Sequence, residues 1–296
     1  MKKIISLLLA TMMCLSLFAA CGNKEDAPKA TNAPETTAAV EENNAPETTA
    51  AAEETTEAAA ETESAAAFTT VEEGKLIMAT NAFFPPYEYY EGEQIVGIDA
   101  EIAQAIAEKL GLELVINDME FDSIITNVKQ GAADFGLAGM TVSEERLQEI
   151  NFSISYASGV QVVIVKEGSA IASVDDLYAE GATYKVGVQL GTTGDIYATG
   201  DFGADRVVAY NKGNEAVMAL AKGDIDCVII DNEPAKAFVK ANEGLVILEA
   251  SYADEDYAAC VAKENEALLE AIDQAILELT EDGTIDGIIA KYIPAE

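Results

Sequence analysis

The sequence contains only two arginines, and one of them, Arg146, lies in a segment suited to holding a carboxylate. It comes seven residues after Gly139, at the end of a short apolar run, in a turn that leads into a helix. Backbone N–H groups at such a turn are free to face an anion, and a planar guanidinium can bind a carboxylate through two parallel hydrogen bonds. A surface ion pair with Glu144 or Glu149 is the alternative.

Asp231 is a candidate for the opposite charge. It ends an apolar strand expected over Cys227–Asp231, and a carboxylate at such a position calls for a structural or functional role. It could accept an ammonium group, or it could cap a helix expected over residues 232–239. The two roles are compatible, and both stay open at this point.

The composition removes whole classes of chemistry. There are no histidines among the 296 residues, so imidazole bases, Ser-His and Cys-His nucleophile pairs and His-containing metal sites are excluded. The 53 acidic residues against 17 basic ones give a formal net charge of −36, which repels phosphate backbones and anionic lipid headgroups. We therefore expect no nucleic-acid partner, no metal, no cofactor and no catalytic residue.

The N-terminus is typical of an export signal. A basic start at Lys2 and Lys3 precedes an apolar run over residues 4–18 that is too short to span a bilayer comfortably. The segment Leu17–Cys21 resembles a bacterial lipobox, which implies a signal peptide over residues 1–21 and lipidation of Cys21. Plain secretion after Ala20 and a retained anchor helix are the alternatives.

Residues 22–68 consist mostly of Ala, Thr and Glu. The sequence Ala33–Ala39 recurs as Ala45–Ala51, twelve residues later. Such a segment buries too little apolar area to offset about 1–2 kcal/mol of backbone entropy per residue. It is predicted to be a disordered tether that provides reach, with a helical stalk over residues 50–67 as the alternative.

The folded part is expected to begin near residue 69 with alternating strands and helices. Apolar runs bounded by breakers predict strands, and apolar residues at helical spacing up to Gly111 predict a helix. A β-α-β-α-β order calls for a largely parallel sheet that binds ligands at the carboxyl ends of its strands. The predicted elements are strands Lys75–Thr80, Leu112–Ile116 and Asp134–Ala138, and helices Ile98–Leu110 and Phe121–Lys129.

A second alternating set follows, and two units of this size imply two lobes with a cleft between them. Its strands are predicted at Val160–Val165, Lys185–Gln189, Cys227–Asp231, Val246–Leu248 and Ala258–Ala262. Its helices are predicted to begin after Gly191, and to cover Asn214–Lys222, Asn232–Val239, Ala267–Leu279 and Ile285–Tyr292.

Six short motifs, in order and covering about residues 72–293, resemble the polar amino-acid-binding proteins of bacterial ABC importers, the extracellular solute-binding proteins of family 3. The motifs are Ala79–Glu88, Gly97–Ile102, Gly139–Arg146, Gly187–Thr193, Val228–Asn232 and Asp282–Ile285. The resemblance implies an α/β, two-lobed periplasmic-binding-protein-like fold, each lobe a mainly parallel sheet flanked by helices, joined by two crossing strands. It divides the chain into lobe 1 (69–162), lobe 2 (163–257) and a return to lobe 1 (258–296).

The resemblance also implies which residues hold the ligand. A free amino acid is a zwitterion, so its site needs a cation or N–H groups for the carboxylate and an anion for the ammonium. Arg146, with Thr141 and the close-approaching backbone of Gly139, would bind the carboxylate, and Asp231 would receive the ammonium. Thr192 and Thr193, at the start of a helix, would donate N–H groups from the second lobe.

The remaining candidates face the ligand's side chain. Phe84 and Phe121 resemble the aromatic residues that sandwich it, whereas Phe83 is expected in the core. Asn81 stands where relatives often read the side chain, and its uncharged amide suits a neutral polar amino acid better than an obligate cation. Gln189 stands where some glutamine-binding proteins have Lys, so specificity for glutamine does not follow from the resemblance. Which amino acid binds is not determined.

The implied mechanism is closure of the two lobes on the ligand. Flexing is expected in the crossing segments Gln161–Val165 and Ala258–Ala262. Closure is complete when Asp231 and Thr193 meet a solute already held by Arg146. We expect a monomer, lipid-anchored at the extracellular face of the cell membrane, whose closed form is read by an ABC permease.

Two other functions also fit parts of the sequence. Some cyclohexadienyl dehydratases resemble these binding proteins, and Glu88 or Asp231 could act as their acid. A lipid-anchored sensor or adhesin module also fits an anchor and a tether. A clamp of Arg146 and Asp231 for a zwitterion is what a binding protein requires, which argues against the dehydratase. The sensor or adhesin would predict no closure on binding and a kinase or transmembrane segment in the chain, so a binding protein without enzymatic activity is favoured.

Two cysteines lie in the expected folded part. Cys227 and Cys260 are each placed in an apolar strand. Buried free thiols are therefore expected, with a disulfide between them as the alternative.

Overall fold

The computed structural model describes residues 68–294. The predicted signal peptide, the lipidation site Cys21 and all but the last residue of the predicted tether lie outside the described residues. Within residues 68–294, none of the helices has both the length and the apolar character that crossing a membrane requires.

A nine-stranded sheet in the order β5-β1-β6-β12-β7-β10-β8-β9, with β11 beside β7, organises the described residues. The two outer groups, β5-β1-β6 and β10-β8-β9, are parallel, and β12 and β7 run antiparallel between them. The strands are β1 (Lys75–Thr80), β5 (Glu113–Asp118), β6 (Phe135–Gly136), β7 (Asn151–Lys166), β8 (Val186–Gln189), β9 (Val207–Tyr210), β10 (Cys227–Asp231), β11 (Leu245–Ile247) and β12 (Ala253–Val261).

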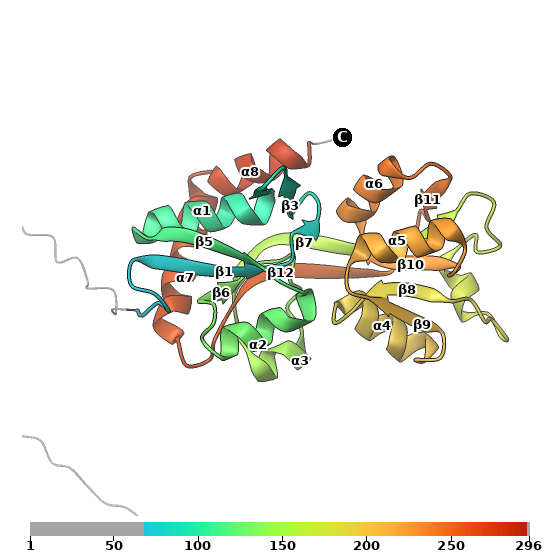
Figure 1. Ribbon diagram of the computed structural model, residues 1–296, viewed down its shortest axis with the longest axis horizontal. Coiled ribbons are helices and arrows are strands. Elements are labelled where there is room, and N and C mark those ends of the chain that lie inside the picture. Colours follow the sequence, from blue (N-terminus) through green and yellow to red (C-terminus); the bar gives the residue numbers. More distant parts are fainter. Residues whose placement is uncertain (1–67, 295–296) are drawn as a thin grey trace, which may run out of the picture. The chain divides into compact units, whose positions relative to one another are not determined.

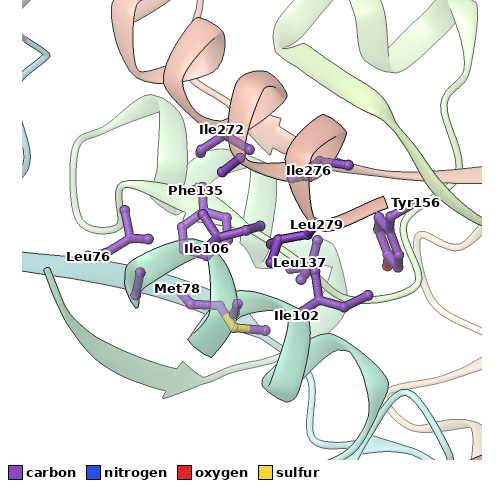
Figure 2. Packing of buried hydrophobic residues seen from close by; sticks show 14 of the residues in the cluster. Leu76, Met78, Ile102, Ile106, Phe135, Leu137, Tyr156, Ile272, Ile276 and Leu279 are labelled. Carbon is purple, nitrogen blue, oxygen red and sulfur yellow. The ribbon is translucent and has the colours of Figure 1, made fainter. Parts of the chain in front are cut away.

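The first lobe is built on β1, β5 and β6. On one face of this group, α1 (Ile98–Leu110), α7 (Glu266–Glu281) and α8 (Thr284–Tyr292) enclose a buried cluster that includes Met78, Ile102 and Ile272 (Figures 1 and 2). On the other face, the 3-10 turn η1 (Phe121–Ser123) and α2 (Ile124–Lys129) cover a second cluster, beside the short helix α3 (Glu144–Glu149).

Local sequence explains why α1 begins and ends where it does. Its apolar residues Ile98, Ile102 and Ile106 lie on one stripe and are fully buried. Gly111 ends the helix in the left-handed conformation, at φ 69°, and its N–H donates to the last carbonyls. The helix matches the prediction residue for residue, as do strands β1 and β10.

The second lobe is built on β8, β9 and β10. Helices α5 (Gly213–Lys222) and α6 (Asn232–Ala241) pack on one face, and α4 (Thr193–Phe202) and the 3-10 turn η2 (Val174–Tyr178) on the other (Figure 1). Each lobe thus has helices on both faces of a parallel group of strands, which confirms the expected fold class.

Strands β7 and β12 join the lobes, but the connection lies a few residues away from the predicted hinge. Gln161–Val165 pair with β10 along their whole length, so they belong to the second lobe's sheet. Cys260 and Val261 pair with β6 in the first lobe. The stretch between the lobes is 156–160 of β7 opposite 254–257 of β12, next to a register irregularity at Tyr257 and Ala258.

Some elements were not predicted. A small antiparallel sheet of β2 (Phe83–Phe84), β3 (Glu88–Glu91) and β4 (Gln94–Val96) lies before α1, and β7 begins nine residues earlier than its apolar run. These strands lack a continuous apolar run, the feature on which the prediction relied. Cys227 and Cys260 are buried free thiols, as expected.

Candidate ligand-binding site

A cavity lies between the lobes, beside the carboxyl ends of β1, β8 and β10; together with the open solvent at its mouth, its empty space is about 440 Å³. The site residues predicted from the sequence come from both lobes, and the cavity brings all ten together. They are Asn81, Phe84, Phe121, Gly139, Thr141, Arg146, Gln189, Thr192, Thr193 and Asp231.

Arg146 lines this cavity and does not form the alternative surface ion pair. Ser143 caps α3 by accepting the N–H of Arg146, which turns the guanidinium side chain inward, where it is only 6% exposed. Glu144 and Glu149 are exposed, and Glu149 pairs with Lys129. Arg146 therefore remains available to an anion in the cavity.

The guanidinium is held by backbone carbonyls of both lobes. Its Nη1 donates to the carbonyl of Thr141 at 2.7 Å and its Nη2 to the carbonyl of Gly191 at 3.1 Å, and it lies over the Phe121 ring at 5.4 Å. Burial lowers the pKa of Arg146, and Glu255 opposes this shift. An arginine stays charged even so, which leaves a buried cation that an anionic group can neutralise.

Backbone and hydroxyl groups surround the guanidinium. Gly139 has a φ of 51°, and a Cβ there would lie 2.9 Å from the Phe84 ring, so glycine keeps this wall open. Thr141 and Thr193 face each other from opposite lobes, with hydroxyl oxygens 3.5 Å apart. Thr192 caps α4 by accepting the N–H of Asp195, which places the N-terminus of that helix at the cavity.

Asp231 caps a helix and also lines the cavity. Its Oδ1 accepts the N–H of Glu233 and caps α6, while its Oδ2 accepts the N–H of Val160 at 3.1 Å and the hydroxyl of Tyr257. Burial raises the pKa of Asp231 to about 7, against the effect of these hydrogen bonds. The carboxylate also lines the cavity, so a ligand cation can reach it.

The aromatic residues form a continuous wall. Phe84 stacks on Tyr87 with ring centroids 5.7 Å apart, and Tyr87 meets Tyr257 edge to face at 5.3 Å. Phe121 lies across the cavity, beneath Arg146. The site can therefore hold an aliphatic or planar side chain between apolar surfaces.

Two amides join the lobes at another part of the wall. Nε2 of Gln189 donates to Oδ1 of Asn81 at 2.9 Å and to the carbonyl of Asn211 at 3.3 Å, while Nδ2 of Asn81 donates to the carbonyl of Met119. Both side chains are buried. Their contact requires the two lobes to be together.

Sequence reasoning missed several lining residues, above all Glu88, Gln161, Glu255 and Tyr257. Glu255 is 6% exposed and accepts a hydrogen bond from Nε2 of Gln161 at 2.9 Å. It is the middle one of three consecutive acids, and nothing local says which of them points inward. The register of β12 against β7 decides this, because it places Glu255 opposite Gly159.

Gly159 is required by the packing beside Tyr257 and Asp231. A Cβ at this position would overlap the Tyr257 hydroxyl and come within 2.6 Å of Oδ2 of Asp231. We expect Gly159→Ala to weaken ligand binding by about 1–3 kcal/mol, or roughly 5- to 150-fold in Kd, because Tyr257 and Asp231 must shift. Calorimetric titration tests this.

Gly200→Ala is the matched control for that prediction. Gly200 lies in α4, is exposed and has open space around its Cα. Alanine there should leave the affinity unchanged and favour the helix by about 0.5–1 kcal/mol. Equal affinities for the wild type and Gly159→Ala would contradict the packing argument.

Two lobes with a charged, aromatic-lined cavity between them, connected by two strands, define a ligand-binding protein of the periplasmic-binding-protein class. The chain belongs to the bacterial extracellular solute-binding proteins, family 3, whose family model matches residues 76–295. The relatives reported below are named as binding proteins, which supports a role without enzymatic activity over the dehydratase alternative.

Known relatives support the assignment over most of the folded part. The chain is 33% identical over 228 residues to the arginine-binding extracellular protein ArtP of Bacillus subtilis, covering 75% of this chain and 87% of ArtP. It is 28% identical to the L-cystine-binding protein TcyJ of Escherichia coli, covering 76% and 85%. Among solved structures, an ancestral arginine-binding protein bound to glutamine has a TM-score of 0.71 and 36% identity, covering 76% of this chain and 100% of that one.

Proposed function

We propose that this protein captures an amino acid outside the cell and delivers it to an ABC permease. The observation that carries the proposal is a cavity lined by one buried guanidinium, Arg146, and by the buried carboxylate of Asp231 from the other lobe. These are the two charges that an α-carboxylate and an α-ammonium need. Relatives named as amino-acid-binding proteins support the same role.

The charges around the cavity favour a ligand with a cationic side chain. Glu88, Asp231 and Glu255 line it against the single cation Arg146. The carboxylate and ammonium of an amino acid would pair with Arg146 and Asp231. The buried carboxyl groups of Glu88 and Glu255 would then still be without a cationic partner from the ligand. Glu88 can ionise when a cation enters the cavity, unlike the uncharged Asn81 that suggested a neutral ligand, and the arginine-binding relatives agree with arginine as the first candidate.

We propose that capture proceeds by closure of the lobes. The contacts of Arg146 with Gly191 and of Asn81 with Gln189 connect the two lobes. A third such contact places the ammonium of Lys212 3.5 Å from the centre of the Phe83 ring. Flexing is placed at residues 156–160 and 254–257, close to the boundaries expected at 162/163 and 257/258. A ligand that touches both lobes favours the closed form by these added contacts.

The proposal extends to the cellular setting. Cys21 would carry the lipid that anchors a monomer to the extracellular face of the membrane, and residues 22–68 would give the binding lobes reach. This arrangement suits transport, for which the relatives are named, better than a sensor or an adhesin. Mass spectrometry of the protein from its native membrane tests the acyl group on Cys21.

Calorimetric titration of the purified protein with each of the twenty amino acids and cystine tests the ligand. We expect the tightest binding for arginine, with lysine and glutamine weaker. Absence of binding across the whole set would refute the proposed function. Tight binding of neutral amino acids alone would refute the cationic class but keep the amino-acid role.

The affinity is expected to depend on pH through Asp231. Burial raises the pKa of this carboxyl to about 7 without ligand, and only its ionised form pairs with an ammonium. Below pH 7 binding must first remove a proton, so the affinity for every amino acid should fall by about tenfold per pH unit. A flat profile between pH 5 and pH 7 would contradict an ammonium on Asp231.

A further inference from the structure

Two carboxyl groups, those of Glu88 and Asp99, lie in the first lobe beside the cavity. The backbone N–H groups of Ile98 and Asp99 donate to the carbonyls of Pro86 and Tyr87, which fastens the start of α1 to the segment before β3. Gly97 permits this approach, because a Cβ there would overlap the Tyr87 carbonyl. The side chains of Glu88 and Asp99 are thereby brought together, and both are fully buried.

The hydrogen bonds of this pair are unequal. Oδ2 of Asp99 accepts the N–H of Gly139 at 2.7 Å and the hydroxyl of Tyr156 at 2.8 Å. Within residues 68–294, no N–H or O–H donor outside the pair gives a hydrogen bond to three of the four carboxyl oxygens of the pair, namely both oxygens of Glu88 and Oδ1 of Asp99. The two side chains also interact with each other through a carboxyl–carboxyl hydrogen bond.

In the part of the chain that the structure describes, no lysine or arginine acts on this pair. The titratable groups that act on it are the Asp118 carboxyl from β5 and the hydroxyls of Tyr87 and Tyr156. Two adjacent buried carboxyl groups cannot both be ionised, so one of them keeps a proton. Asp99 has the two donors and is the ionised member, which leaves the proton on Glu88.

The pKa values agree in direction. Burial, followed by the charge of Asp99, raises the pKa of Glu88 well above its usual value. Burial also raises the pKa of Asp99, to about 6, against the hydrogen bonds that it accepts. Glu88 is thus a neutral acid in the ligand-free protein, and it is the member of the pair that lines the cavity.

We propose that Glu88 makes the preference of the site for cationic over neutral ligand side chains depend on pH. A cationic side chain expels the proton that Glu88 shares with Asp99. A neutral amide instead accepts a hydrogen bond from the protonated Glu88. In the first case the O–H bond of Glu88 breaks, the carboxylate pairs with the ligand cation, and the proton goes to solvent. In the second case the carboxylic acid donates to the amide oxygen and no proton leaves. This inference rests on the proposed amino-acid site and deepens it.

A measurable consequence is the ratio of two affinities. Asp231 acts on the α-ammonium of every amino acid, so its effect cancels when arginine is compared with glutamine. The affinity ratio of arginine to glutamine should rise with pH, by up to about tenfold per unit, as long as Glu88 is protonated without ligand and ionised with arginine. An ancestral relative has been solved with each of these two ligands, which makes them suitable probes.

The experiment is calorimetric titration of the full chain with arginine and with glutamine, from pH 6 to pH 8, in pairs of buffers with different ionisation enthalpies. The difference between buffers gives the protons released on binding. We expect arginine to release up to one proton more than glutamine at the same pH. Equal release by both ligands, or a ratio independent of pH, would overturn the inference.

Variants assign the proton to Glu88. Glu88→Gln keeps a hydrogen-bond donor but cannot ionise, so the extra proton release should vanish and arginine should lose at least tenfold more affinity than glutamine. Glu91→Gln, exposed on the same strand, is the control and should behave as the wild type. If Glu88→Gln leaves proton release and selectivity unchanged, the inference is wrong.

Failure of the inference differs from failure of the proposed function. Binding of arginine and glutamine with equal proton release overturns only the role of Glu88. Absence of binding by any amino acid overturns both. The wild-type comparison of buffers needs no variant, so it decides the matter even if Glu88→Gln does not fold.

Discussion

Arg146→Ala is expected to reduce the affinity for the amino acid by about 100- to 1,000-fold, roughly 3–4 kcal/mol, with little change in the fold. The guanidinium is buried in the cavity and bound only by neutral carbonyls of Thr141 and Gly191. Its removal leaves the ligand's carboxylate desolvated without a cation. Calorimetric titration and thermal unfolding of the same preparation separate lost binding from lost stability.

The other arginine is the control for this prediction. Arg206 donates to the carbonyls of Tyr184 and Leu177 and stacks on Phe202, and it does not line the cavity. Arg206→Ala should therefore change stability but not affinity. Arg146→Lys, which keeps the charge but loses the planar fork, should fall between the wild type and Arg146→Ala. Unchanged binding by a folded Arg146→Ala protein would refute the site.

Asp231→Asn is expected to have the second-largest effect, a loss of about 2–4 kcal/mol in binding, or roughly 30- to 1,000-fold. Asparagine retains an oxygen for the N–H of Glu233, and it is as good an N-cap as aspartate. The substitution therefore removes the charge that meets the ammonium while keeping the cap of α6. Titration with the preferred amino acid measures the loss.

The cap alone can be tested elsewhere in the chain. Ser173 caps the turn η2, away from the cavity, and Ser173→Ala should cost about 1 kcal/mol of stability without affecting ligand binding. If Asp231→Asn binds as tightly as the wild type, Asp231 is only a helix cap. The comparison thus separates the two roles that the sequence left open.

Much of the site could be predicted because it lies at ends of regular elements. Arg146, Thr192 and Asp231 each follow a strand or begin a helix, and such positions are marked locally by apolar runs and capping residues. The resemblance of six ordered motifs then assigned them to one cleft. The apolar run over 160–165 suggested the hinge, but most of this run pairs with β10 in the second lobe, so we now expect flexing in the residues just before it.

The chain's own sequence determined the order of elements, the absence of histidine chemistry and the identity of two charged residues, Arg146 and Asp231, that line the cavity. Only the tertiary structure decided which acids join them. Glu255 turns inward because of its register against β7, and Glu88 meets Asp99 because the start of α1 is fastened to the segment before β3. Both depend on contacts between segments distant in the chain or on the pleat of a strand, and local residue patterns do not encode such contacts.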